Sequence, residues 1–292
     1  LTGTYYIHVR GVSDNAGNTT DTQVSGAFRF DNTDPTISVS PTSSSAAKSV
    51  NVTIRASDSH SGLSSSNSYQ YYLSTSQYSQ TGGDGWHGYS NGYSTKIGEG
   101  LDGTYYLHVR GVSDNAGNSC ANKVTGPYVF ANTPPTITIT PNSQSSYTKS
   151  TYVKINVRDN SGTGLSSSNS YQYYVSTSSS YSSYGDWKNY TPGNSIKIGE
   201  GLTGTYYIHV KPVYDNAGNS SGSETSGAFH FDNTAPTIVI SPNYNYNWTQ
   251  STNVTITVQD SGGSGLSSSN SYQYYLSTSS TTTTGGDGWH TY

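Results

Sequence analysis

Sulfur-containing and charged residues are both scarce in this sequence of 292 residues. It has one cysteine and no methionine, and Asp, Glu, Lys and Arg make up only 10% of the chain. A lone Cys120 excludes an intrachain disulfide. Its counterparts in the other copies of an internal repeat, described below, are Thr20 and Ser221. We therefore interpret Cys120 as a tolerated substitution and not as a reactive thiol.

Aliphatic residues are few, and no long apolar run occurs. Leu, Ile, Val and Phe together number 45, a share typical of disordered chains, but the net charge of −4 is too small for that class. No stretch approaches the ~20 apolar residues that a membrane-spanning helix needs, and no charged-then-apolar leader opens the sequence. We expect a soluble segment of a longer protein, without membrane insertion in this segment.

Basic clusters and catalytic motifs are also missing. The 13 Lys and Arg residues never cluster against the 17 Asp and Glu residues, which makes nucleic acid a poor partner. There is no nucleophile motif, and Glu occurs only at positions 99, 200 and 224. His8, His108 and His209 recur on what we expect to be the solvent-exposed face of a strand. The sequence therefore predicts neither an enzyme nor a cofactor-binding site.

The sequence does contain a repeat with a period of 100 to 102 residues. GLSSSNSYQYYLSTS at 62–76 returns at 265–279 and, with one change, at 164–178. GTYY(I/L)HV begins at residues 3, 103 and 204, and DNAGN begins at residues 14, 114 and 215. NTxPTI begins at residues 32, 132 and 233. Near-identity over a domain-sized period indicates tandem duplication of one folding unit.

Within each copy the apolar residues alternate with polar ones. Val50, Val52, Ile54 and Ala56 share one face of a strand predicted at 50–57, and segments 69–74 and 104–112 alternate in the same way. Gly, Ser, Asn, Asp and Pro clusters separate these segments, and no segment has helical periodicity. Further strands are expected at 36–40, around 86–97 and at 128–130. The sequence thus predicts an all-β fold of tandem antiparallel sandwiches, with about seven strands per ~100 residues, whose cores depend on the 28 tyrosines.

Three of these stretches together resemble the bacterial immunoglobulin-like repeats of secreted and surface-attached proteins. They are GTYYLHVRGVSDNAGN, the DNTxPTI junctions and the turn ending in Ser-Gly-Leu, and the likeness covers essentially the whole chain. The resemblance implies an extracellular or cell-surface protein, such as a stalk, filament or adhesin. It also implies calcium near the domain junctions.

If each domain begins at the proline of NTxPTI, the chain holds four parts. Residues 1–34 are the last two strands of one domain, 35–134 and 135–235 are complete domains, and 236–292 are the first strands of a fourth. We expect a window of a longer array. The two terminal parts are complementary, because 236–292 lacks the strands that 1–34 contains. We therefore expect strand addition between them, with the partner being a copy of the chain or an adjacent repeat.

Acidic residues gather at the predicted junctions. In an immunoglobulin-like sandwich, the linker into the first strand and two inter-strand loops lie at one pole. Carboxylates meeting there would suit Ca²⁺, which binds 6–8 oxygen ligands, although Asp and Asn are also good turn formers. The second junction has Ala131 in place of a linker aspartate. The candidate ligands are Asp31, with its neighbour Asp34, Asp58 and Asp114 at the first junction, Asp159 and Asp215 at the second, and Asp232 and Asp260 at the third.

Aromatic residues support a second hypothesis, an array of carbohydrate-binding or adhesive modules that recognises surface glycans. Three tryptophans recur near tyrosines, as Trp86 with Tyr89, Trp187 with Tyr190, and Trp289 with Tyr292. We expect them to plug one end of each sandwich. Other tyrosines are predicted to point away from the core, where they form cross-strand pairs or a binding surface; they are Tyr72, Tyr106, Tyr173, Tyr207 and Tyr275. A non-enzymatic extracellular stalk or filament is our leading hypothesis.

Overall fold

The computed structural model describes residues 1–83, 85–283 and 285–292, and throughout these residues the regular secondary structure is β. Two compact units account for the chain. The first comprises Leu1–Pro135, Asp159–Ser167 and Tyr214–Ser220, and the second comprises Thr136–Arg158, Ser168–Val213 and Ser221–Tyr292. Among the described residues, no helix is long and apolar enough to cross a membrane. The repeat boundaries at 34, 134 and 235 stay a prediction.

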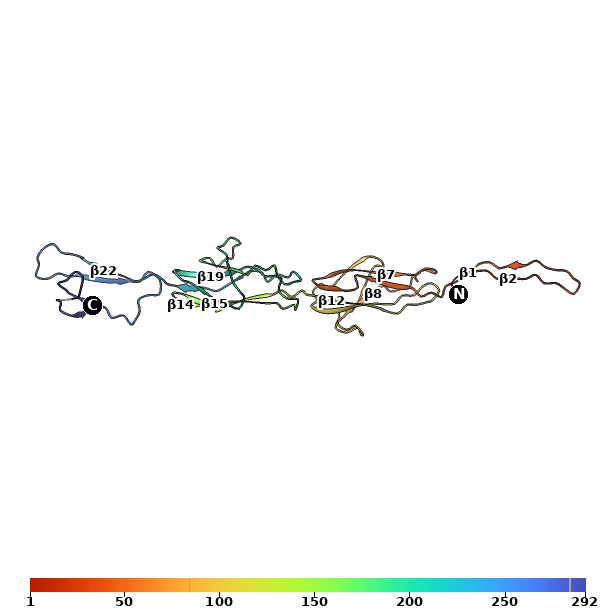
Figure 1. Ribbon diagram of the computed structural model, residues 1–292, viewed down its shortest axis with the longest axis horizontal. Helices are drawn as coiled ribbons and strands as arrows, with labels where there is room; N and C mark the ends of the chain where they lie inside the picture. Colours follow the sequence, from red (N-terminus) through yellow and green to blue (C-terminus); the bar gives the residue numbers. More distant parts are fainter. Residues whose placement is uncertain (84, 284) are drawn as a thin grey trace. The chain divides into compact units, whose positions relative to one another are not determined.

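The first unit contains a two-sheet sandwich (Figure 1). One sheet has the order β10-β7-β5, and the other has the order β6-β12-β11-β8-β9. All neighbours are antiparallel except β6 and β12, which are parallel. This strand order is that of an immunoglobulin-like sandwich. The bounds are β5 Thr36–Ser40, β6 Ser44–Ala47, β7 Val50–Ser57, β8 Gln70–Ser74, β9 Trp86–Gly88, β10 Ser94–Ile97, β11 Gly103–Val109 and β12 Lys123–Phe130.

The alternation predicted from the sequence explains this sandwich. Val52 and Ile54 of β7 are fully buried, whereas Asn51 and Arg55 are exposed. The buried face of β7 packs on residues from the facing sheet, among them Leu107. The predicted strands 36–40 and 50–57 are confirmed residue for residue. The prediction did not include β6, because SSAA carries no alternating apolar residues.

The second unit contains a sandwich of the same design. Its sheets have the orders β13-β15-β18 and β14-β21-β19-β16-β17, and β20 also pairs with β19. Ile155, Ile208, Phe229 and Phe231 lie fully buried between the sheets. The bounds are β13 Thr136–Thr140, β14 Gln144–Thr148, β15 Thr151–Arg158, β16 Gln172–Ser176, β17 Lys188–Asn189, β18 Ser195–Ile198, β19 Gly204–Val210, β20 Glu224–Thr225 and β21 Phe229–Phe231.

The two terminal segments form smaller sheets. Residues 1–34 fold into a ribbon made of two short antiparallel strand pairs, one after the other, drawn in red in Figure 1. Its strands are β1 Gly3–Tyr5, β2 His8–Val9, β3 Gln23–Val24 and β4 Phe28–Phe30, with β1 paired to β4 and β2 to β3. Residues 236–292 contain the pairs β22 Thr237–Ser241 with β23 Thr255–Gln259, and β24 Gln273–Tyr275 with β25 Trp289–Thr291.

The expected exposure of the histidines is wrong for two of the three. His8 is exposed, but His108 and His209 are buried. The segment that follows β8 or β16 turns back over the outer face of the sheet. Its carbonyls then meet the histidines, Ser76 O lying 2.9 Å from His108 Nε2 and Ser178 O lying 2.9 Å from His209 Nε2. These histidines are hydrogen-bonded packing residues of a covered sheet face.

The prediction that Tyr173 points away from the core is also wrong, by one position in the strand. Tyr173 lies in the core, and its neighbour Tyr174 faces the other side of the sheet, against Trp187 and His209. The repeat alignment agrees, since Tyr174 and not Tyr173 corresponds to Tyr72. A shift of one residue reverses the face of every side chain in a strand.

Candidate metal centre

Three aspartates converge on one point in the first unit. Asp31 lies in the linker between β4 and β5, Asp58 follows β7 directly, and Asp114 lies between β11 and β12. One carboxylate oxygen from each lies within 4.8 Å of the others. Asp34, the neighbour of Asp31 on the linker, is not part of this group. The sandwich thus brings together three of the predicted ligands, from positions up to 83 residues apart in the sequence.

Backbone amides hold each carboxylate in place. Asp31 accepts hydrogen bonds from Thr33 N and Ser61 N, both at 2.9 Å. Asp58 Oδ2 accepts from His60 N at 3.1 Å and Gly62 N at 2.7 Å. The turn geometry therefore fixes the directions in which the remaining oxygens point.

The DNAGN turn orients the third carboxylate. Asp114 Oδ1 accepts from Ala116 N at 2.9 Å and Asn118 N at 2.8 Å, and Oδ2 accepts from Asn118 Nδ2 at 2.7 Å. Burial opposes ionisation of Asp114, but these bonds outweigh it and hold its pKa below the ordinary value. At Asp31 the bond from Thr33 N is the main cause of a lowered pKa. Both groups are therefore anionic at neutral pH.

One buried oxygen at this point has no hydrogen-bond partner, Oδ1 of Asp58. A buried polar atom left unpaired costs about 1–3 kcal/mol, so such atoms are rare in native folds. Three carboxylates with an unpaired oxygen among them are a donor set suited to a hard cation such as Ca²⁺.

The second junction brings together two aspartates. The hydroxyl of Ser161 lies 2.9 Å from Asp159 Oδ1 and 3.1 Å from Asp215 Oδ2, and it donates its one proton to either carboxylate. Asn219 Nδ2 donates to the carbonyl of Ala131 at 2.9 Å, as Asn118 Nδ2 donates to Asp31 O at 3.0 Å. Ala131 brings no carboxylate, and the two aspartates of this junction are connected through a serine hydroxyl.

The third junction also brings two of the predicted ligands together. Ser264 donates from its backbone to Asp232 Oδ2 at 3.1 Å, and its hydroxyl hydrogen-bonds to the same oxygen. The same hydroxyl lies 3.4 Å from Asp260 Oδ2. Beside them is a cavity of about 380 Å³, whose lining includes Asp232, Asp260, Leu266 and Asn270.

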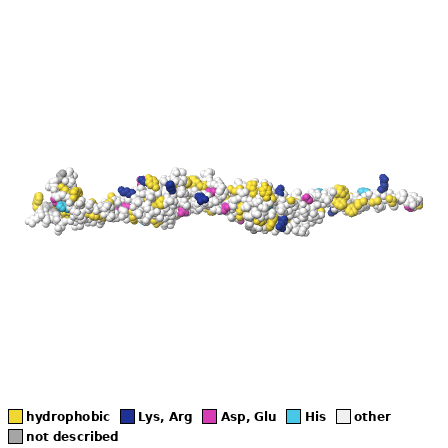
Figure 2. Space-filling model, turned by 90° about the horizontal axis from the view of Figure 1, so that it is seen from below, with side chains coloured by type: hydrophobic (Ala, Val, Ile, Leu, Met, Phe, Trp, Pro, Cys, Tyr) yellow, Lys and Arg dark blue, Asp and Glu magenta, His cyan; other side chains and the backbone are white. Residues whose placement is uncertain are grey.

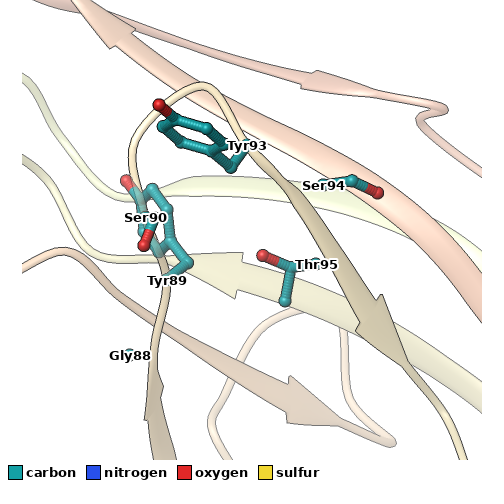
Figure 3. A pocket seen from close by; sticks show the side chains of 6 residues that line it. All are labelled: Gly88, Tyr89, Ser90, Tyr93, Ser94 and Thr95. Carbon is teal, nitrogen blue, oxygen red and sulfur yellow. The ribbon is translucent and has the colours of Figure 1, made fainter.

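A larger cavity on the first unit is lined by tyrosine, serine, threonine and glycine residues. It has a volume of about 570 Å³, and Figure 3 shows its lining residues around the turn between β9 and β10. Tyr89 and Tyr93 supply its aromatic rings, and burial raises the pKa of Tyr89 to about 12. The remaining lining residues are Gly88, Ser90, Ser94 and Thr95. Among the described residues that line it, only the two tyrosines have an ionisable side chain.

The tryptophans do not plug the sandwich ends, contrary to our expectation. Trp86 on β9 is the register partner of Tyr72, on the sheet face opposite the core, and their rings meet edge to face at 5.8 Å. The guanidinium of Arg110 lies 4.7 Å from its ring centre. Trp187 repeats this arrangement with Tyr174 and Lys211. Cross-strand pairing and cation–π contact account for their positions.

Sequence reasoning missed the residues that connect the carboxylates. Asn118, Ser161 and Ser264 each bond to an aspartate of the site. A signal for the asparagine was present, because it is the last residue of every DNAGN copy. Ser264 also carried a signal, because it stands directly before Gly-Leu as Ser61 does, and the backbone of Ser61 likewise donates to Asp31. Ser161 carried none, since Thr163 occupies that position in its copy.

Comparison with known proteins gives two structural likenesses. No protein-family model matches the sequence, and no curated protein matches it. Three N-terminal domains of the bacteriophage RB49 highly immunogenic outer capsid protein (Hoc) are similar at 12% identity, with a TM-score of 0.36, over 79% of this chain and 88% of that one. Domains FN1–FN3 of chicken CNTN1 are similar at 14% identity, with a TM-score of 0.24, over 76% and 74%. At these scores the fold assignment rests on the strand order given above.

Proposed function

We propose that this chain is a non-enzymatic structural protein of the cell exterior, an array of immunoglobulin-like sandwiches that forms a stalk or filament. Ca²⁺ binds at its junctions and fixes each linker to the sandwich that follows. The observation that carries the proposal is the convergence of Asp31, Asp58 and Asp114 around the unpaired Asp58 Oδ1.

The linker position of one ligand supports a mechanical role. Asp31 is one of only five residues, 31–35, between β4 and β5. Asp58 and Asp114 belong to loops of the following sandwich. An ion held by all three ties the linker to these loops, because each carboxylate would have to leave the ion before the linker could swing away. Such ties suit a protein that must keep its repeats in line.

The other candidate ligands fit the same proposal unequally. Asp159 with Asp215, and Asp232 with Asp260, supply two carboxylates per junction. Two carboxylates attract a cation less strongly than three, and at the second junction the Ser161 hydroxyl already lies between them. We therefore assign the tightest Ca²⁺ site to the first junction.

Thermal unfolding with and without Ca²⁺ tests the proposal. An ion bound only by the folded state raises stability by about 2.7 kcal/mol when its concentration is 100 times Kd. The intact chain, at a dilution that keeps it monomeric, should melt at a higher temperature in millimolar Ca²⁺ than in chelator, and Asp58→Asn should remove most of the difference. Asp186→Asn, which removes the same charge from an exposed loop, is the matched control and should keep it. An equal melting temperature with Ca²⁺ and with chelator would reject the calcium junction.

Glycan binding is the alternative function, and it also stays a prediction. Trp289 is the most exposed of the three recurring tryptophans, and Trp86 and Trp187 each have a cation over the ring. A glycan array probed with the intact chain and with Trp187→Ala separates the two functions. Binding that Trp187→Ala abolishes would favour the adhesive array over the stalk.

A further inference from the structure

Residues 236–292 expose apolar side chains whose counterparts are buried or partly buried in the two sandwiches. Leu276 is 61% exposed, whereas its counterpart Leu73 is 4% exposed. Val254 is 47% exposed, against 0% for Val52 and 1% for Val153. In the sandwiches these positions are covered by β11 and β12, or by β19 and β21. Among the described residues, no strand equivalent to those lies over 236–292.

Residues 1–34 expose the complementary set. Ile7, Val9 and Phe30 are 55%, 56% and 43% exposed. Their counterparts Leu107, Val109 and Phe130 are all 0% exposed. The hydrophobic side chains of this ribbon lie open at the right-hand end of Figure 2. The segment holds the same strands, in the same antiparallel pairing, as those that cover the sandwich cores.

We infer that residues 1–34 of a second copy of this chain dock on residues 236–292 and complete a sandwich, so that the chain associates head to tail. The inference rests on the proposed function, because it names the partner of the third junction. Both sandwiches supply its template. Leu107 pairs with Leu73, and Ile208 pairs with Val175. By the repeat, Ile7 of one copy then pairs with Leu276 of the other.

The cavity at the third junction matches the DNAGN turn. In the first sandwich, this turn fills the equivalent place, with Leu63 bridged to Asp114 and Asn115 N donating to Gly62 O at 2.9 Å. The side chain of Asn67 exchanges two hydrogen bonds with the backbone of Ser113, at 2.7 and 2.8 Å. The corresponding residues Gly265, Leu266 and Asn270 line the cavity of about 380 Å³. The turn at 14–18 of a second copy would make the same bonds.

The turn at 14–18 has the same internal hydrogen bonds as the turn at 114–118. Asp14 Oδ1 accepts from Ala16 N at 2.9 Å and Asn18 N at 2.8 Å, and Oδ2 accepts from Asn18 Nδ2 at 2.7 Å. These are the distances found around Asp114. A docked Asp14 becomes the third carboxylate beside Asp232 and Asp260, so docking creates a site like the one at the first junction. Association should therefore depend on Ca²⁺.

The segment before β23 gains a partner in the same way. In the second unit β14 runs parallel to β21, and the rings of Tyr147 and His230 lie 5.2 Å apart. Trp248, which is fully exposed, corresponds to Tyr147, and Arg29 corresponds to His230. Docking places Arg29 of one copy beside Trp248 of the other, a favourable cation–π pair. A strand equivalent to β10 is not supplied by either segment, so one edge of β23 stays open in the joined sandwich.

Sedimentation velocity of the intact 31.1 kDa chain over a range of concentrations tests the inference. The chain should form a ladder of oligomers that lengthens with concentration and shortens in chelator. Ile7→Asp disables the donor segment, and Leu276→Asp disables the acceptor face. Both side chains are exposed in the single chain, so the substitutions spare its folding, and circular dichroism checks this. Each variant alone should be monomeric, with association weakened at least about 100-fold by a buried unpaired charge.

The mixture of the two variants gives the decisive result. It should form a 1:1 dimer and nothing longer, because only one intact donor and one intact acceptor remain. Thr4→Asp and Thr257→Asp, at exposed positions whose counterparts Thr104 and Arg55 are exposed in the sandwich, are the controls and should associate like the unaltered chain.

Three outcomes would overturn the inference. They are a monomeric unaltered chain at every concentration, oligomers that persist in Ile7→Asp alone, and a mixture that stays monomeric. These outcomes leave the proposed function intact if Ca²⁺ still raises the melting temperature of the monomer through Asp58. Loss of that effect with head-to-tail association retained would reject the calcium junction instead.

Discussion

The side-chain amide of Asn118 donates a hydrogen bond to the backbone carbonyl of Asp31, 3.0 Å away, although 87 positions separate the two residues. The same amide donates to Asp114 Oδ2 at 2.7 Å. One asparagine thus joins the linker to the DNAGN turn. Asn219 does the same for Ala131 and Asp215. Hydrogen bonds within the protein therefore hold the linker to the sandwich, whether or not an ion is bound.

Asn118→Ala should cost about 1–3 kcal/mol of stability, because it leaves a part-buried carbonyl and a carboxylate oxygen without their donor. Urea unfolding of the intact chain, followed by tyrosine fluorescence, measures the loss. Asn18→Ala is the matched control. Asn18 makes the same bond to Asp14 in an exposed turn, so its removal should cost less. Equal losses would show that the bond across the linker contributes nothing.

Ala131→Asp should add a calcium site to the second junction. The carbonyl of Ala131 accepts from Asn219 as that of Asp31 accepts from Asn118, so the new carboxylate starts from an equivalent backbone position. Together with Asp159 and Asp215 it completes three carboxylates. Equilibrium dialysis of monomeric chain should then find one more ion bound per chain. Ala131→Asn, similar in size but uncharged, should bind no more than the unaltered chain. A folded Ala131→Asp variant with no additional ion would contradict the prediction.

The two faces of β7 should respond differently to truncation. Ile54 is fully buried, and its replacement by Ala should cost about 2–5 kcal/mol. Arg55, its neighbour on the exposed face, should change stability by no more than about 0.5 kcal/mol when replaced by Ala. Denaturant unfolding of the two variants makes the comparison. Similar losses at both positions would mean that the side chains of β7 do not alternate as described.

The second sandwich should lose stability as the pH falls from about 7.5 to 5. Burial lowers the pKa of His209 below its ordinary value of 6.5, partly offset by the carbonyl of Ser178. The unfolded chain therefore binds a proton at a higher pH than the folded chain, and stability is lost as the pH drops through the unfolded pKa. Its titratable neighbours include Tyr174, stacked on the ring, Tyr181, whose ring lies edge-on at 6.5 Å, and Lys211, two residues away in sequence.

Melting curves across this pH range provide the measurement. His209→Gln removes the titration but keeps polar atoms for hydrogen bonding, so its melting temperature should change less with pH. The aspartates whose pKa is lowered act in a separate window, because their contribution is lost only as the pH falls below their ordinary value of 3.8. An unchanged slope in His209→Gln would show that another group is responsible.

The fold could be predicted from the sequence wherever one strand face is apolar. The alternation of Val50 to Ala56 predicted β7 residue for residue, and strand pairing then followed from the sandwich. Strand β6 could not be predicted in this way, because it is held by parallel pairing to β12 and not by an apolar face. The predicted exposure of His108 is wrong for a related reason. Alternation tells which face of a sheet a residue occupies, but not whether a distant loop covers that face.

The aspartates of the candidate site could be predicted from the sequence, but the hydrogen bonds that link them could not. Asp31, Asp58 and Asp114 follow from the common pole of a sandwich, which the repeat made recognisable. The serine hydroxyls that join Asp159 to Asp215 and Asp232 to Asp260 depend on loop conformation. From the aspartate to the leucine these loops have six, seven and seven residues. Ser264 shares with Ser61 the position before Gly-Leu, but Thr163 holds that position in the second copy, so Ser161 could not be chosen from the repeat.

Isothermal titration of the dilute, monomeric chain with Ca²⁺ tests the central claim most directly. The unaltered chain should bind one ion tightly at the site of Asp31, Asp58 and Asp114, and Asp58→Asn should remove that binding while Asp186→Asn leaves it unchanged. Heats that are absent in the unaltered chain, or that Asp58→Asn leaves unchanged, would contradict the account.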